Sequence, residues 1–65
     1  MKGEKNMYKA LYQVSSMYPY YYSVIICYCG KECTRLITGT TCDTWEDLER
    51  YARSYSAELV FDGII

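Results

Sequence analysis

Residues 10–30 form an uncharged stretch of 21 residues, and this stretch constrains the fold more than any other feature of the sequence. It is long enough to cross a bilayer as a helix. However, it contains six tyrosines, three serines, one glutamine and one proline, and such polarity is unfavourable in a membrane span. Tyrosine and β-branched residues are enriched in strands. We therefore interpret the stretch as part of a β-sheet and expect no membrane association.

Alternation of apolar and polar residues predicts three strands in the first two thirds of the chain. Residues 8–14 alternate between apolar and polar. One face of the predicted strand carries Tyr8, Ala10, Tyr12 and Val14, and the other carries Lys9 and Gln13. Residues 20–29 are apolar on both faces, which is typical of a central strand. A turn over residues 15–19 joins these two strands. A third strand is predicted over residues 33–38, followed by a connector over residues 39–42.

The hairpin between the second and third strands is ambiguous in register. Gly30, Lys31 and Glu32 are suited to a three-residue loop, because glycine adopts the positive φ that tight loops need. A two-residue loop instead moves Leu36 to the face of Ile25 and Cys27. Both registers remain open from the sequence.

One helix and a last strand are predicted in the remaining third. Asp43 or Thr44 is a suitable N-cap, and acidic residues in the first turn favour a helix start. Apolar residues then recur at helical spacing, at Trp45, Leu48, Ala52 and Tyr55. Alternation returns over residues 57–62. The predicted fold is a single α+β domain over residues 7–65, with an antiparallel sheet of three to four strands and one helix packed on one face, in the order β-β-β-α-β. Residues 1–6 are polar and are predicted to be a disordered tail.

The length of 65 residues and the absence of histidine disfavour catalysis. A chain this short buries only about 60% of its unfolded surface, so its core is thin. A ligand pocket of about 300–1,000 Å³ is hard to fit in such a core. Histidine is the commonest general base and the commonest metal ligand. We therefore expect a protein that is not an enzyme and that has neither catalytic residues nor a cofactor.

Four cysteines give the spacing C-x-C-x₃-C-x₈-C, at Cys27, Cys29, Cys33 and Cys42. Four thiolates are able to bind zinc, but zinc ribbons use C-x₂-C pairs on turns. The third strand also separates Cys33 from Cys42 by about 20 Å, which is too far for one metal ion. We expect the four cysteines to be buried and to act as small hydrophobic residues, with their thiols reduced in the cytoplasm. A Cys29–Cys33 disulfide and a zinc site formed by the four thiolates are the alternatives.

Nine residues are tyrosine, and six of these fall between residues 8 and 22. A sheet this small cannot bury all six, so some must be exposed. Exposed aromatic patches mark interaction surfaces, and tyrosine is enriched at binding hot spots. We therefore expect a protein-binding face whose candidate contact residues are Tyr18, Tyr20, Tyr21 and Tyr22. Replacement of Tyr20 and Tyr22 by alanine is expected to affect partner binding more than folding. Half-buried tyrosines without a function, and a platform on which the bases of single-stranded nucleic acid stack, are the alternatives.

Charge is unevenly distributed along the chain. Residues 1–40 carry five basic and two acidic residues, whereas residues 41–65 carry two basic and six acidic residues, so the net charges are +3 and −4. A duplex-binding protein usually has a clear basic excess, so nucleic acid is not the expected partner. The acidic cluster at the helix start suits either solvent or a basic partner surface. Its members are Asp43, Glu46, Asp47 and Glu49.

These features favour a non-catalytic protein-binding module in the cytoplasm. In the most concrete form, it is a small inhibitor that docks on a larger nucleic-acid-processing protein through its tyrosines and its acidic helix start. Proteins of this size and composition are frequent in phages and mobile elements, where anti-CRISPR proteins are one example and the host cytoplasm is the compartment; this analogy rests on no motif. A single-strand binder and a zinc-stabilised subunit are the alternatives. Homodimerisation is compatible with each, because a small core gains stability from a partner.

Overall fold

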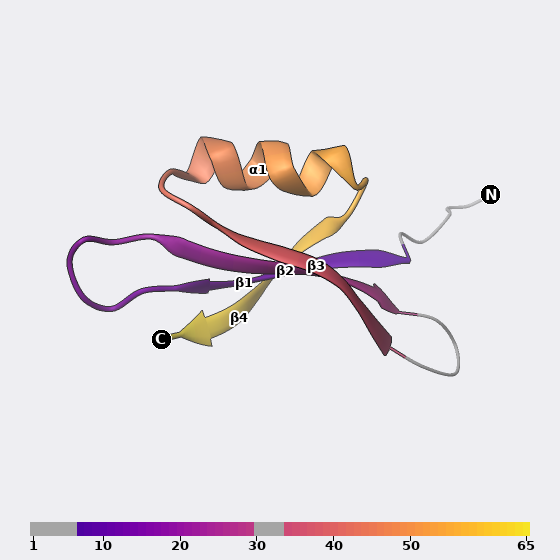
Figure 1. The fold of residues 1–65 in the computed structure, drawn as a ribbon, viewed down its shortest axis with the longest axis horizontal. Coiled ribbons are helices and arrows are strands. Elements are labelled where there is room, and N and C mark those ends of the chain that lie inside the picture. Colours follow the sequence, from indigo (N-terminus) through magenta and orange to yellow (C-terminus); the bar gives the residue numbers. More distant parts are fainter. Residues whose placement is uncertain (1–6, 30–33) are drawn as a thin grey trace.

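The computed structural model describes residues 7–29 and 34–65. It confirms a small α+β fold in the order β1, β2, β3, α1, β4 (Figure 1). The predicted tail over residues 1–6 and the predicted hairpin loop lie outside the described residues. No helix formed by the described residues has the length and apolar character needed to cross a membrane. The elements are β1 (Tyr8–Val14), β2 (Tyr22–Cys29), β3 (Thr34–Cys42), α1 (Trp45–Ser54) and β4 (Glu58–Ile64).

The four strands form one mixed sheet in the order β3-β2-β1-β4. We predicted an antiparallel sheet, which is correct for β1, β2 and β3, but β4 is parallel to β1. The difference follows from the connection through α1, which carries the chain from the β3 edge across one face to the β4 edge (Figure 1). β4 therefore runs in the same direction as β3. Since β1 and β3 are both antiparallel to β2, β4 is parallel to β1.

The helix begins as the sequence predicted. Thr44 is the N-cap, and its Oγ1 accepts a hydrogen bond from the backbone N–H of Asp47 at 3.1 Å. This bond satisfies one of the first N–H groups of the helix, which have no partner within it. Leu48 and Ala52 are the buried residues of α1. They pack on the sheet in a core completed by Ala10, Val24, Ile26 and Cys42.

Several strand boundaries differ from the prediction, among them the ends of β4, which was predicted over residues 57–62 and spans Glu58–Ile64. β2 begins at Tyr22, because Tyr20 and Tyr21 belong to the connection with β1. β3 continues to Cys42, through the residues that we predicted as a connector. Gly39 pairs with Ile25, and a Cβ atom on Gly39 would lie 3.1 Å from the Ile25 Cγ2 atom. Glycine here therefore gives room to the neighbouring side chain and does not end the strand.

A bulge interrupts the pairing of β2 with β3. Ile26 pairs with Thr38 and Cys27 pairs with Leu36, so Ile37 is the additional residue on β3. Leu36 consequently lies on the same face as Cys27. This is the placement expected from the shorter of the two hairpin registers, and the bulge is a feature that the sequence did not reveal.

A second irregularity lies between β4 and β1, where the register shifts next to Gly63. Gly63 has a φ of 113°, which non-glycine residues rarely adopt. We predict that Gly63→Ala lowers the free energy of unfolding by about 1–3 kcal/mol, the usual magnitude for a residue held at such an angle. Urea unfolding of the variant beside the wild type measures the loss. Equal midpoints would show that the chain end relaxes without strain.

Candidate functional site at the aromatic end of the sheet

Four aromatic rings pack together where the start of α1 lies over the sheet. The centroid of Tyr12 lies 5.4 Å from that of Trp45, 5.7 Å from that of Phe61 and 6.3 Å from that of Tyr22. Tyr22 also contacts Trp45 at 5.8 Å. All four contacts are edge-to-face, an arrangement that adds about 0.5–1.5 kcal/mol per pair beyond burial. The cluster is only partly covered. Trp45, the first of the apolar residues that recur at helical spacing, is 41% exposed.

The connection between β1 and β2 lies beside this cluster and is closed by Ser15. The Ser15 backbone N–H donates to the Tyr21 carbonyl at 3.0 Å, and the Tyr21 N–H donates to the Ser15 Oγ at 3.1 Å. The same hydroxyl donates to the Met17 carbonyl at 3.2 Å. Ser15 is itself buried. These bonds fix both ends of the loop, so its central residues, Tyr18 and Tyr20, project to solvent with 84% and 64% of their surface exposed.

The end of the chain is joined to the same loop. The Ile65 N–H donates to the Val14 carbonyl at 2.9 Å, and the Ile65 carbonyl accepts from the Ser16 N–H at 2.9 Å and from the Ser16 Oγ at 2.8 Å. Figure 1 shows the loop and the C-terminus at the same end of the sheet. Ile64 and Ile65 are both exposed. Two apolar segments that are far apart in the sequence therefore form one surface.

We call this surface the aromatic end. Its exposed apolar side chains come from the β1–β2 loop, from the first residue of α1 and from β4 with the residue after it: Met17, Tyr18, Tyr20, Trp45, Phe61, Ile64 and Ile65. Single exposed apolar residues are common on soluble proteins, but contiguous groups mark binding sites. Of the candidate contact residues, Tyr18 and Tyr20 are exposed to solvent, whereas Tyr21 and Tyr22 are half-buried.

The acidic candidates do not form one patch. Asp43 and Asp47 line a depression between α1 and β3, which Arg50 also lines. Glu49 lines a different depression, between α1 and β4. Arg50 Nη1 forms an ion pair with Asp47 Oδ1 at 3.1 Å. Glu46, in the first turn beside Trp45, is exposed. The negative field of the helix start is thus divided between two sides of α1 and is partly neutralised on one of them.

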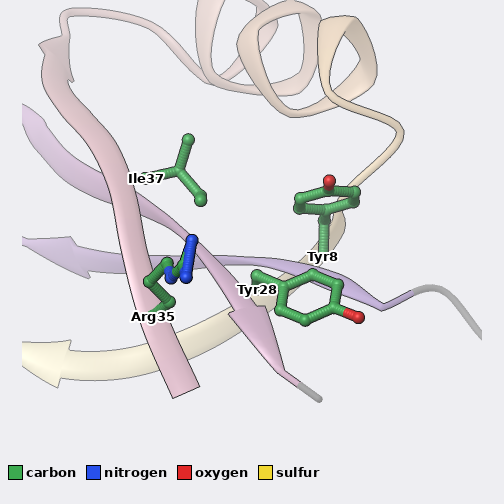
Figure 2. A pocket seen from close by; sticks show the side chains of 4 residues that line it. All are labelled: Tyr8, Tyr28, Arg35 and Ile37. Atoms are coloured by element: carbon green, nitrogen blue, oxygen red, sulfur yellow. The ribbon is translucent and has the colours of Figure 1, made fainter. Parts of the chain in front are cut away.

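A separate pocket lies at the opposite end of the sheet (Figure 2). Tyr8, Tyr28 and Arg35 are successive cross-strand neighbours on β1, β2 and β3, and the bulge residue Ile37 completes the lining. The rings of Tyr8 and Tyr28 are in edge-to-face contact at 5.4 Å. This is a place where a cationic side chain adjoins two tyrosines, as base stacking with phosphate binding requires.

The described cysteines are divided between the two faces of the sheet. Cys42 pairs with Tyr22 and belongs to the core under α1, whereas Cys27 lies five positions along β2 on the other face. Cys29 pairs with Thr34 and is a free thiol, so it does not form the alternative disulfide. Among residues 7–29 and 34–65, no three metal-ligating side chains of histidine, cysteine, aspartate or glutamate gather as a metal site requires. Cys33 lies outside the described residues.

The buried thiols are protected from ionisation. Burial raises the pKa of the Cys27 thiol, and the negative charges of Cys29 and Asp62 raise it further. Burial also raises the pKa of Cys42, with smaller effects from Asp47 and Asp43. A thiol whose pKa is raised is protonated at neutral pH and is a poor nucleophile.

This protection predicts a loss of stability at alkaline pH. Unfolded thiols ionise at about pH 8.5, below the raised pKa values of the folded protein. The two thiols therefore stabilise the fold fully below that pH, and the contribution is lost as the pH rises through their folded pKa values. Urea unfolding between pH 7 and pH 10 measures the decline, which we expect to be shallower in Cys27→Ala and in Cys42→Ala. Parallel curves for the three proteins would contradict this assignment.

Sequence reasoning missed several residues of the aromatic end. Phe61, Ile64 and Ile65 received no role, and Ser15 was treated only as part of a turn. The apolar pair at the end of the chain was a visible signal. However, nothing local indicates that it lies beside the β1–β2 loop, because the hydrogen bonds that join them link residues 49 positions apart.

Comparison with protein-family models, with curated proteins and with solved structures finds no match for this chain.

Proposed function

We propose that this chain is a non-catalytic protein-binding module that contacts its partner through the aromatic end. The observation that carries the proposal is the gathering of exposed apolar side chains from three separate segments at one end of a small sheet. Such a surface is costly to leave in water and is typical of binding sites. Tyrosine and tryptophan also combine a large apolar ring with a polar group, which suits an interface that is wet when the partner is absent.

The rigidity of the aromatic end also favours a role in binding. Tyr18 and Tyr20 contact each other at 5.9 Å, and the loop that carries them is closed at both ends by Ser15. Side chains that are ordered before binding lose less conformational entropy when they bind. The exposed Glu46 beside Trp45 adds a negative charge that favours a partner with a basic surface. An inhibitor that docks on a larger nucleic-acid-processing protein is one form of this function.

The test is a pull-down of the tagged chain from lysate of its native or host cell, with and without nuclease. The proposal expects one protein, captured in stoichiometric amount, that survives nuclease treatment. A second function, binding of single-stranded nucleic acid, is favoured by the Tyr8, Tyr28 and Arg35 pocket (Figure 2). In that case the captured material is nucleic acid, disappears with nuclease and depends steeply on salt.

A further inference from the structure

β3 is a long edge strand, and no other described strand pairs with its outer side. It spans nine residues, Thr34–Cys42, and all of them after Arg35 are uncharged. Leu36 is 63% exposed, and Ile37 is exposed as well. The outer row of backbone N–H and C=O groups on such an edge is a template for another strand. Natural sheets usually block it with lysine, proline or inward-pointing charge, and β3 contains no lysine or proline.

The opposite edge of the sheet, β4, is protected against the addition of a strand by charged residues and by irregular pairing. β4 contains Glu58 and Asp62, both exposed, and its pairing with β1 is irregular next to Gly63. Its last residues are also joined to the β1–β2 loop through Ile65. Charge and irregular geometry both disfavour the addition of a strand. The two edges of one small sheet are therefore treated differently, and β3 is the one open to pairing.

We propose that a second copy of this chain pairs with β3 in antiparallel orientation, so that the two sheets become one. The two-fold axis passes beside Gly39, where the absence of a side chain permits close approach of two backbones. Thr38 then faces Thr40 of the second copy, a favourable cross-strand pair. Ile37 is an additional, unpaired residue of β3 in its pairing with β2. If Ile37 is also unpaired in both copies of β3 here, Arg35 lies opposite Cys42 of the second copy.

Charge complementarity supports this register. Asp43 follows Cys42 directly, and Cys42, Asp43 and Asp47 line the same depression beside β3. Arg35 of one copy therefore arrives next to the acidic residues of the other, and the symmetry makes this contact twice. Among the described residues, Arg35 forms no ion pair within its own chain. Asp47 is already paired with Arg50, but Asp43 forms no ion pair among the described residues. Arg35 and Asp43 are thus available for contact between copies, which is why we assign the edge to a second copy.

The test is sedimentation velocity of the purified chain at increasing concentration, with charge reversals on β3. The wild type is expected to show a monomer–dimer equilibrium. Arg35→Glu and Asp43→Arg each place like charges together and are expected to weaken the dimer at least about tenfold. The double variant R35E/D43R restores opposite charges and is expected to return the dissociation constant to within about threefold of the wild type. Circular dichroism of dilute samples verifies that each variant is folded.

Matched controls reverse charges away from β3. Arg53→Glu, on the helix, and Asp62→Arg, on β4, make the same changes of charge at exposed positions and are expected to leave the dimer unchanged. A chain that stays monomeric at every concentration overturns the proposal, and so does a dimer that is insensitive to both β3 reversals. Loss of association in both single variants without restoration in R35E/D43R refutes the proposed register.

Discussion

Replacement of Leu48 by alanine is expected to remove about half of the free energy of unfolding. Leu48 is 0% exposed and is the largest side chain that α1 contributes to the core. Truncation of a buried leucine costs about 2–5 kcal/mol, because contacts are lost and a cavity is left. A domain of this length has a total stability of only about 3–10 kcal/mol. The loss is also not confined to the helix, since α1 is the connection that brings β4 to the sheet.

Urea unfolding monitored by circular dichroism measures this effect. Leu36→Ala is the matched control, because it removes the same atoms from a side chain that is 63% exposed. We expect that control to change the stability by less than about 0.5 kcal/mol in dilute protein. Unfolding of the two leucine variants at the same urea concentration would contradict the packing of α1 on the sheet.

The second large effect is expected on partner binding. Tyr18→Ala combined with Tyr20→Ala removes the two most exposed tyrosines of the aromatic end. If they are hot spots, each truncation costs about 2 kcal/mol or more, so the pair weakens binding several hundredfold or more if the effects add. The captured protein in the pull-down is then expected to fall to background. The fold is expected to be unchanged, because neither ring belongs to the core.

Tyr8→Ala is the matched control, since it removes an exposed tyrosine from the far end of β1. It is expected to keep the partner. Retention of the partner by the Tyr18 and Tyr20 double variant would remove the aromatic end from the binding surface. The pair Tyr20 and Tyr22, which the sequence suggested, is a poorer choice. Tyr22 packs on the core and contacts both Tyr12 and Trp45, so its loss destabilises the fold as well.

The two proposals use different parts of the molecule. The aromatic end lies where β1 and β4 finish, whereas the second copy pairs along the β3 edge. Antiparallel pairing places the two aromatic ends at opposite ends of the joined sheet. A dimer would therefore present two separated binding surfaces, and a partner with two sites would gain avidity from it.

Local sequence determined the elements of this protein. Alternation marked β1, helical spacing marked a stripe that includes the buried Leu48 and Ala52, and the pair Asp43 and Thr44 marked the start of the helix. These features act within a few residues, through the two periodicities of strand and helix and through capping. The sequence also contains more tyrosines than a core of this size can bury, which correctly predicted that some of these rings are exposed.

Tertiary structure decided how the elements meet. The parallel pairing of β4, the bulge at Ile37 and the extension of β3 through Gly39 all depend on neighbours far away in the sequence. So does the aromatic end, which exists because the crossover through α1 brings Ile65 back to Ser16. The same crossover decides that the side of α1 with Asp43 and Asp47 faces β3, whereas the side with Glu49 faces β4. Burial of the apolar face of the helix selects among strand orders and registers that local propensity leaves equivalent.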